Sequence, residues 1–423
     1  MSVGELPRVW VWVYSQVWVV VVVARLARAF CPYGCQCDEA VPSARCVGAS
    51  MGVVPILLNP SMRTLNLANN AITSIAQAFV FYDQLEQMDL SQNDIKSLGT
   101  GNFDAQGRLR ELKLAHNNIS ELLPGSFHGL GELSLLDLSY NSVREIPVTL
   151  FTDVPELTVL LLEHNRLHAL PQHTFRSLSF LHHINLCDNY FRHVPSQALE
   201  DLSSLKTIHL CRNRLTTLEE NAFPNKALSS LYLESNSISI ISDTAFHYLQ
   251  KLKKLNLEDN LLRGIPSPAL SSLLQLEFLS LNKNNLTNIT NGAFLSMGRL
   301  ARLEVSWCPE LRLLHPQILD HCVNLHTFKL SHNPQLVELP TNLLVSVPRL
   351  RVLDLSFNSL KGLLESAVPV HTLTQLDVRG NPLVCNCSLL WLASLLATPN
   401  ASIITPDLQC QHPPKLRGVY LSR

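Results

Sequence analysis

The fold of this chain is decided by the stretch from Leu133 to Val143, which reads Leu-Ser-Leu-Leu-Asp-Leu-Ser-Tyr-Asn-Ser-Val. Leucines fill its first, fourth and sixth positions, an asparagine its ninth and an aliphatic residue its eleventh. The fourth and sixth positions alternate with polar or mixed ones, which indicates a short strand with one face turned inward. Asn141 follows where the chain turns. Its amide can bond backbone groups that a buried turn would otherwise leave unpaired.

The same pattern recurs along most of the chain at a spacing of 23 to 25 residues. Its ninth position is filled, in order, by Asn70, Asn93, Asn117, Asn141, Asn165, Asn189, Asn213, Asn236, Asn260, Asn284, Cys308, Asn333, Asn358 and Asn381. These fourteen positions define fourteen repeats, and chance does not produce such regularity. The only substitution is Cys308, and cysteine is a known alternative at this position.

These repeats resemble leucine-rich repeats, and the resemblance implies one curved solenoid in place of several globular domains. A single repeat cannot bury its apolar face, whereas stacked neighbours share a continuous core. We therefore expect an α/β solenoid over residues 59–383, shaped as a horseshoe of about 14 repeats. Parallel strands should form its concave wall, and disulfide-stapled caps should close both ends.

Composition and charge exclude several classes of function. Hydrophobic residues make up 46% of the chain, and 33 basic residues balance 34 acidic ones, so no nucleic-acid partner is indicated. The sequence contains no nucleophile elbow, no phosphate-binding loop and no paired zinc-protease histidines. We therefore expect a protein that is not an enzyme and needs no cofactor.

Residues 1–29 have the features of a secretory signal peptide. Arg8 precedes the uncharged, valine-rich run Val9–Ala24, and Ala27-Arg28-Ala29 fits the small-x-small cleavage pattern. An uncleaved signal anchor is the alternative, because the apolar run approaches the length that spans a bilayer. Cleavage is favoured, since a cysteine cluster begins directly afterwards and would leave an anchor little linker.

Residues 30–58 contain four cysteines within sixteen residues, and we predict that they form an amino-terminal cap. Cys31, Cys35, Cys37 and Cys46 indicate a disulfide knot in a secreted chain, with a zinc site as the less favoured alternative. Such a cap would cover the core of the first repeat, which has no neighbour on that side. The cluster resembles the amino-terminal cap of extracellular leucine-rich-repeat proteins. That resemblance implies the bridges Cys31–Cys37 and Cys35–Cys46.

Residues 384–423 resemble the matching carboxy-terminal cap. The run Cys385-Asn386-Cys387 is followed by Trp391, Cys410 and a Pro-Lys-Leu-Arg-Gly segment. The resemblance implies a Cys385–Cys410 bridge and places the partner of Cys387 beyond Arg423. We therefore expect a truncated cap, with a membrane-attachment segment after Arg423.

Features around the repeats resemble a narrower group, the arthropod tartan/capricious proteins. The resemblance is carried by the Cys-Pro-x-Gly-Cys-x-Cys-Asp-Glu cap, by Phe79-Val80-Phe81-Tyr82, by Arg302-Leu303-Glu304-Val305 and by the repeat count. It implies a single-pass cell-surface protein that acts in cell–cell recognition, with an extracellular protein ligand or receptor as partner. Homophilic binding is left open. The alternatives are a Toll-like immune receptor ectodomain and a secreted matrix protein.

Five Asn-x-Ser/Thr sequons predict glycosylation in the secretory pathway. The acceptor residues are Asn118, Asn285, Asn288, Asn386 and Asn400. Asn118 and Asn285 directly follow a ninth-position asparagine, so glycans there would crowd that edge of the solenoid. Asn386, beside a cysteine expected to be bridged, is the acceptor least expected to be used.

Strand alternation predicts which side chains form the concave wall. Third, fifth and seventh positions should point away from the core, and the eighth should lie at the rim. Positions five and seven carry eight acids and three bases, which predicts an acidic wall and argues against a heparin-like polyanion ligand. An alternative is that aspartate at the fifth position is routine in such repeats.

Aromatic and histidine side chains are also predicted on this wall and rim, and we expect them to contact a protein partner. They are His116, Tyr140, His164, His209, Tyr232, Phe278, Trp307, His332 and Phe357. The alternative is that some of them are covered by neighbouring side chains.

Cys187 and Cys211 occupy the seventh position of adjacent repeats, so they should lie side by side on the wall, within disulfide reach. A disulfide is favoured, while two free thiols and a zinc site with nearby histidines remain open. Cys308 and Cys322 fall at core positions, where two buried thiols are expected.

Overall fold

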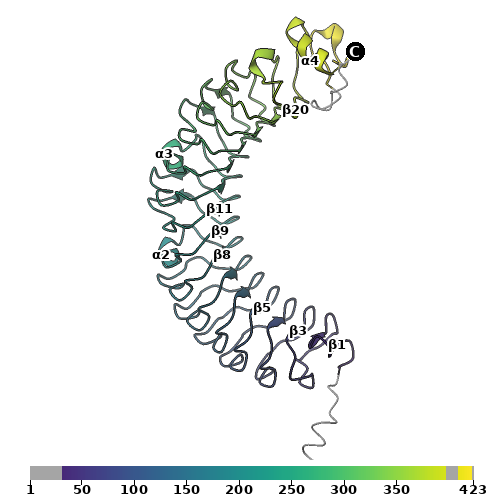
Figure 1. The fold of residues 1–423 in the computed structure, drawn as a ribbon, viewed down its shortest axis with the longest axis vertical. Helices are drawn as coiled ribbons and strands as arrows, with labels where there is room; N and C mark the ends of the chain where they lie inside the picture. The colour runs from purple at the N-terminus through teal and green to yellow at the C-terminus, as the bar shows by residue number, and fades with distance from the viewer. Residues whose placement is uncertain (1–30, 397–407, 422–423) are drawn as a thin grey trace, which may run out of the picture.

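The computed structural model describes residues 31–396 and 408–421, and these form one curved stack of turns (Figure 1). The expected signal peptide at residues 1–29, Phe30 of the expected cap and the sequon asparagine Asn400 lie outside the described residues. Short strands line the inner side of the arc, and turns with a few short helices form its outer side. Among the described residues, no helix is long and apolar enough to cross a membrane.

One continuous sheet of sixteen short strands runs along the whole inner side. In the cap, β1 (Gln36–Asp38) pairs antiparallel with β2 (Ser43–Arg45). Fourteen parallel strands follow: β3 (Thr64–Asn66), β4 (Gln87–Asp89), β5 (Glu111–Lys113), β6 (Leu135–Asp137), β7 (Val159–Leu161), β8 (His183–Asn185), β9 (Thr207–His209), β11 (Ser230–Tyr232), β13 (Lys254–Asn256), β14 (Phe278–Ser280), β16 (Arg302–Glu304), β18 (Thr327–Lys329), β19 (Val352–Asp354) and β20 (Gln375–Asp377). One strand per repeat confirms the predicted solenoid of fourteen turns.

Short strands and helical turns also occur outside the inner sheet. Two-residue strands pair between neighbouring turns, namely β10 (Thr217–Leu218) with β12 (Ile240–Ile241) and β15 (Asn288–Ile289) with β17 (Leu313–Leu314). Helical turns occur at α2 (Ser196–Leu199), α3 (Ser267–Leu270) and η1 (Glu365–Ala367). The carboxy-terminal region contains η2 (Cys387–Leu389), α4 (Leu390–Leu396) and η4 (Pro414–Leu416).

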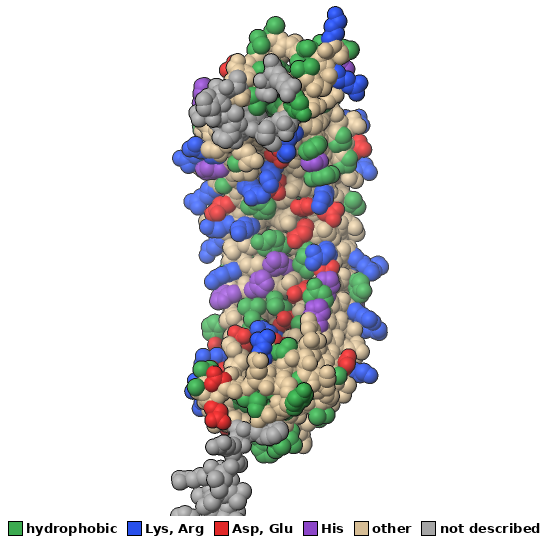
Figure 2. Space-filling view, turned by 90° about the vertical axis from the view of Figure 1, so that its right-hand side faces the viewer, with side chains coloured by type: hydrophobic (Ala, Val, Ile, Leu, Met, Phe, Trp, Pro, Cys, Tyr) green, Lys and Arg blue, Asp and Glu red, His purple; other side chains and the backbone are tan. Residues whose placement is uncertain are grey.

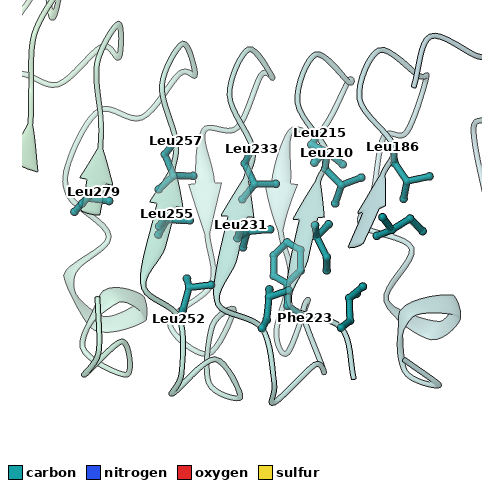
Figure 3. Packing of buried hydrophobic residues seen from close by; sticks show 14 of the residues in the cluster. Leu186, Leu210, Leu215, Phe223, Leu231, Leu233, Leu252, Leu255, Leu257 and Leu279 are labelled. Carbon is teal, nitrogen blue, oxygen red and sulfur yellow. The ribbon is translucent and has the colours of Figure 1, made fainter. Parts of the chain in front are cut away.

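The core is a ladder of leucines that runs through the solenoid (Figure 3). In each repeat the fourth and sixth residues point inward, as Leu231 in β11 and Leu233 just after it do, and both are fully buried. Phenylalanines enter from the convex side and stack from turn to turn, with the rings of Phe223 and Phe246 6.2 Å apart. Each such side chain contributes about 2 kcal/mol through burial, so stability is spread evenly along the stack.

The ninth-position asparagines hold adjacent turns together. The amide nitrogen of Asn141 donates to the carbonyls of Leu114, Leu138 and Ser139 at 3.0 to 3.1 Å. Its side-chain oxygen accepts the backbone N–H of Ile119 at 3.0 Å. One side chain therefore satisfies four backbone groups in two repeats, which are groups that burial would otherwise penalise.

In the eleventh repeat Cys308 stands in place of this asparagine, and its thiol forms weaker hydrogen bonds than the amide. Its sulfur lies 3.7 Å from the carbonyls of Leu281 and Ser306, two of the acceptors that the amide serves elsewhere. Cys322 is buried on the convex side, and both cysteines are unpaired. Burial raises the pKa of Cys308 to about 11 and that of Cys322 to about 12, so both remain neutral thiols.

The eighth residue of every repeat adopts a left-handed backbone conformation, with φ between +48° and +69°. In order, these residues are Asn69, Gln92, His116, Tyr140, His164, Asp188, Arg212, Ser235, Asp259, Lys283, Trp307, His332, Phe357 and Gly380. This conformation costs about 1 kcal/mol for a residue other than glycine. The turn that follows each strand therefore has a fixed shape, and it places the eighth side chain at the edge of the wall.

Disulfides close the two ends of the stack. Cys31 is joined to Cys37 and Cys35 to Cys46 in the amino-terminal cap, and Cys385 is joined to Cys410 at the other end. Cys387 is exposed and unpaired. The indole N–H of Trp391 donates to the carbonyl of Leu363 at 3.0 Å, which links α4 to the preceding repeat.

Candidate recognition surface

The inner face of the arc divides into two parallel zones, which Figure 2 shows face on. We call the third, fifth and seventh positions of the repeats the wall, and the eighth positions the rim. Histidine side chains gather about halfway along this face (Figure 2). Eight of the nine predicted contact residues fall into three separate groups on these zones, and Phe278 lies apart from them.

The first group is a stack of rings on the rim of repeats three to five. The Tyr140 ring lies 4.0 Å from His116 on one side and 4.0 Å from His164 on the other, with interplanar angles of 15° and 17°. Tyr140 is 41% exposed. Because the flat faces cover one another, the stack offers a partner its ring edges and polar atoms.

The second group is a matching stack on the rim of repeats eleven to thirteen. His332 lies between Trp307 at 3.8 Å and Phe357 at 4.6 Å. Trp307 and Phe357 are 53% and 48% exposed, so the outer rings remain available to a partner. A Cβ atom at Gly380 would overlap the Phe357 ring, so glycine in the next repeat makes room for the end of the stack.

Charged side chains lie between the two stacks. His164 Nε2 lies 3.2 Å from an oxygen of Asp188, and Arg212 Nε donates to the same oxygen at 2.6 Å. Lys283 pairs with Glu258 at 2.8 Å further along. These pairs extend the row of interacting side chains from the first stack toward the second.

The third group lies at the centre of the wall. The ring of His209 stacks on Tyr232 at 4.3 Å and lies 5.1 Å from the ring of His183. Burial, helped by the neighbouring His183, lowers the pKa of His209 to about 4, and burial also lowers that of His183. Both imidazoles are therefore neutral at physiological pH and offer one donor and one acceptor each.

Cys187 and Cys211 form a disulfide between β8 and β9, with Cα atoms 4.6 Å apart. This is the bridge that the sequence favoured, and because its cysteines are only 3% and 4% exposed it lies beneath the surface of the wall. Seventh-position side chains lie close to the base of the turn, where neighbouring repeats cover them. Glu163 and Glu234 occupy the same position on either side, and burial raises the pKa of each carboxyl group.

The acids behind the predicted acidic wall differ in their exposure. Among the eight acids counted from the sequence (Asp89, Asp137, Glu163, Glu234, Glu258, Glu304, Asp354 and Asp377), Glu304 and Asp377 are each 7% exposed. Glu304 accepts hydrogen bonds from Arg302 at 2.7 Å and from Asn282 at 3.0 Å, and it pairs with Lys329 at 3.1 Å. Asp377 pairs with Arg379 at 2.7 Å. Lys329 and Arg379, two of the three bases in the count, therefore pair with these two acids, and the third base, Lys113, pairs with Glu111 at 3.6 Å.

Phe278 is placed differently from the other predicted contact residues. Its side chain is half-buried on the wall, and the guanidinium carbon of Arg302 lies 5.6 Å from its ring centroid. The aliphatic and charged parts of Arg302 thus cover it. Phe278 belongs to the packing of the wall more than to its contact surface.

The predicted glycan acceptors within the described residues are all exposed, namely Asn118, Asn285, Asn288 and Asn386. The side-chain oxygen of Asn386 accepts hydrogen bonds from the N–H and the hydroxyl of Ser388. Its amide nitrogen, which would carry a glycan, points away from those contacts. Glycosylation at these residues remains a prediction.

The arrangement suits binding more than catalysis. Within the described ranges, no group of three or more His, Cys, Asp or Glu side chains is placed to hold a metal ion. The polar atoms of the two ring stacks belong to a tyrosine hydroxyl, an indole and imidazoles, which hydrogen-bond to peptide groups. Aromatic anchors next to such donors are typical of protein interfaces.

Two features of the surface were not evident from the sequence pattern. Neither the left-handed conformation at the eighth position nor the face-to-face ring stacks it permits was predicted. A usable signal was present, because ring residues recur at the eighth position of repeats three, four and five and again in repeats eleven, twelve and thirteen. Positions one repeat apart lie side by side, so the two clusters could have been found.

Sequence comparisons agree with the repeat architecture. A family model described as "Leucine rich repeat" matches residues 83–143, 155–210, 203–262 and 250–309, and a second "Leucine Rich Repeat" model matches residues 349–369. Human leucine-rich repeat-containing protein 70 is 43% identical over 70 residues. That match covers 16% of this chain and 11% of the human protein.

Similar solved structures include large horseshoe proteins found in complexes. Mouse RP105, from its complex with MD-1, has a TM-score of 0.68 at 22% identity, covering 88% of this chain and 76% of that one. Toll, from the Drosophila Toll–Spatzle complex, has a TM-score of 0.69 at 18% identity, covering 86% and 60%. A chain of the LRIM1/APL1C complex has a TM-score of 0.67 at 26% identity, covering 84% and 62%. The chain thus spans less than two thirds of the length of two of these three chains.

Proposed function

The chain belongs to the leucine-rich-repeat family, and we propose that it is an extracellular protein-recognition module whose partner contacts the two ring stacks. The observation that carries this proposal is the exposure of Tyr140, Trp307 and Phe357 on a rim with fixed backbone geometry. Exposed aromatic side chains that are already ordered by stacking lose little conformational freedom when they bind.

The stacking geometry favours a protein over a sugar as the partner. A sugar ring typically needs an open aromatic face, and these faces lie 3.8 to 4.6 Å from one another within each stack. What remains is a row of ring edges with hydrogen-bonding atoms. Support also comes from the similar structures, since the matching chains come from the RP105/MD-1, Toll–Spatzle and LRIM1/APL1C complexes.

The setting we propose is the cell surface, reached through the secretory pathway. Four disulfides support an oxidising compartment. Within this setting we favour cell–cell adhesion or recognition of the tartan/capricious type over a Toll-like receptor or a secreted matrix protein. The full-length product, tagged and followed by surface labelling of intact cells, should be found on cells and absent from the medium.

A cell-binding assay tests the recognition surface. Beads that carry the protein are mixed with a panel of cell types, and bound cells are counted for the wild type and for Trp307→Ala. Truncation of an interface anchor typically costs about 2 kcal/mol, so adhesion should fall by more than tenfold. Phe180→Ala is the matched control, because Phe180 is 51% exposed but precedes a strand on the opposite edge.

Melting temperature and secretion of Trp307→Ala should stay near wild type. If the variant instead loses stability, the indole serves the fold. If Trp307→Ala and Phe180→Ala reduce adhesion equally, the rim is not the contact surface.

A further inference from the structure

Four exposed arginines lie on the side of the solenoid formed by the residues directly after the ninth-position asparagines. Arg144, Arg166, Arg192 and Arg214 occupy the tenth or twelfth position in four consecutive repeats, the fourth to the seventh. The eleventh residue between these positions is fully buried in each of these repeats. Tenth and twelfth side chains therefore point outward, and we call this surface the ladder flank.

Backbone hydrogen bonds set these residues side by side. The N–H of Arg166 donates to the carbonyl of Val143, next to Arg144, at 2.8 Å. In the same way, the N–H of Arg214 donates to Phe191, next to Arg192, at 2.9 Å. The N–H of Tyr190 joins the two pairs through the carbonyl of Leu167 at 2.7 Å.

None of the four arginines forms an ion pair within the described ranges, although Arg144 lines one pocket together with Glu121 and Glu145. Arg214 lies 4.4 Å above the ring of Tyr190. Across positions ten to thirteen of these four repeats there is one acid, Glu145. The patch is therefore positive by three charges, while the whole chain has a net charge of −1.

The opposite flank, formed by the residues that precede each strand, does not have this excess of unpaired arginines. There the bases are interspersed with acids and pair with them across neighbouring repeats. Arg63 lies 3.6 Å from Glu86, Arg110 lies 3.6 Å from Glu132, and Lys253 lies 2.9 Å from Glu277.

The sequons leave this stretch of the ladder flank free. Asn118 lies in the third repeat and Asn285 in the tenth, and no Asn-x-Ser/Thr sequence occurs between them. Glycans at the predicted acceptors would thus border the arginine patch without covering it.

We propose that the ladder flank of repeats four to seven binds a linear sulfated polysaccharide of the glycosaminoglycan class. Guanidinium groups bind the oxygens of sulfate and phosphate groups through paired N–H donors. A row of such groups, one per repeat, matches a chain that carries anions at short regular intervals. The expectation against a heparin-like ligand was drawn from the wall, and the ladder flank carries the opposite charge.

Other polyanions fit the site less well. The disulfides place the protein in an oxidising compartment, where nucleic acids are not the usual partners. Anionic lipids are concentrated on the cytoplasmic leaflet, away from that compartment. An acidic protein is the alternative that the test below separates from a sulfated polysaccharide through the binding of poly-L-glutamate.

The test measures binding of a heparin dodecasaccharide to the whole chain at several salt concentrations. The variant replaces Arg144, Arg166, Arg192 and Arg214 together with glutamine. Affinity should fall by about tenfold or more, and the slope of log affinity against log salt should become shallower, because fewer counterions are released. A set with the same charge change, R108Q, R110Q, R299Q and R349Q on the opposite flank, should retain wild-type affinity.

Three results would overturn the proposal. The first is wild-type affinity in the ladder-flank variant. The second is an equal loss in the opposite-flank set. The third is a preference for poly-L-glutamate or phosphatidylserine vesicles over heparin. If the fourfold variant does not fold, the pairs R144Q/R166Q and R192Q/R214Q replace it, and each should lose part of the affinity while keeping the melting temperature.

Discussion

Charged side chains on the wall and on the ladder flank differ in their burial and in their ion pairs. On the wall, Glu304 and Asp377 are nearly buried and each is met by one or more basic side chains. On the ladder flank, Arg166 and Arg192 are exposed and form no ion pair within the part of the chain that the structure describes. Charges that are buried and paired are costly to remove, whereas free surface charges can be exchanged with little effect on stability. The wall charges therefore serve the fold first, and those of the ladder flank are available to a ligand.

The strongest test of this contrast is Glu304→Ala. Removing the carboxylate leaves Arg302, Lys329 and Asn282 without their shared acceptor. We expect the free energy of unfolding to fall by about 3 kcal/mol, measured by urea denaturation. The control is Glu310→Ala, because that side chain is 53% exposed and pairs only with Arg312. Equal effects of the two substitutions would remove the distinction between buried and exposed charges.

The pH dependence of this interaction follows from its pKa. Burial alone would raise the pKa of Glu304, but hydrogen bonds from Arg302, Lys329 and Asn282 outweigh it, so the pKa is lowered. An acid with a lowered folded-state pKa stabilises the fold above its unfolded pKa and loses that contribution as pH falls through the folded value. The difference between wild type and Glu304→Ala should therefore shrink in acid.

A second test uses His209 at the centre of the wall. Its pKa is about 4, below the ordinary value of 6.5, because the ring is buried beside His183. The unfolded chain takes up a proton between pH 6.5 and 4 while the folded chain does not, so stability is lost over this range as pH falls. Allowing for partial exposure of the ring, we expect about 2 kcal/mol of this loss to come from His209.

The measurement compares unfolding at pH 7 and pH 4.5 for wild type and His209→Gln. The variant should show a smaller loss in acid than wild type. His326→Gln, which changes an exposed histidine, is the control. If His209→Gln follows the wild-type pH profile, the histidine is more open to solvent than the structure indicates.

In a third test the substitutions are expected to raise the free energy of unfolding at neutral pH. Burial raises the pKa of Glu163 and Glu234, so their ionised forms oppose folding above the folded-state pKa, and acidification relieves this. The double substitution Glu163→Gln and Glu234→Gln should stabilise the protein by about 1 kcal/mol at pH 7. The gain should vanish at pH 4, as measured by the same denaturation series. Destabilisation at pH 7 would mean that the two carboxylates have a partner.

The smallest effect is expected on the ladder flank. The fourfold arginine-to-glutamine variant should unfold within about 0.5 kcal/mol of wild type, since surface changes away from special features rarely exceed this. Thermal unfolding followed by circular dichroism is sufficient to check it. A larger loss would show that these arginines help to hold adjacent repeats together.

The repeat period was enough to predict the architecture. A ninth-position asparagine every 23 to 25 residues determines the strand count, the core positions and the place of each rim residue. Local periodicity determines these features because each repeat contacts only its neighbours. The paired cysteines at 187 and 211 could be placed together for the same reason.

Burial within the wall could not be predicted in the same way. Strand alternation states which way a side chain points but not whether the adjacent turn covers it, as it covers Cys187 and Cys211. Ion pairs such as Glu304 with Lys329 join different positions of neighbouring repeats, and they depend on side-chain reach. Formal charge counted along one set of positions therefore does not show which acids are buried and paired.

The left-handed residue that ends each strand has a consequence for engineering. β-branched residues and proline fit this conformation poorly, and valine, isoleucine, threonine and proline are absent from all fourteen such positions. A combinatorial library on the rim should therefore draw from histidine, aromatic, amide, acidic, basic, serine and glycine codons only. With that restricted alphabet, selection could redirect the specificity of the protein while the scaffold beneath stays unchanged.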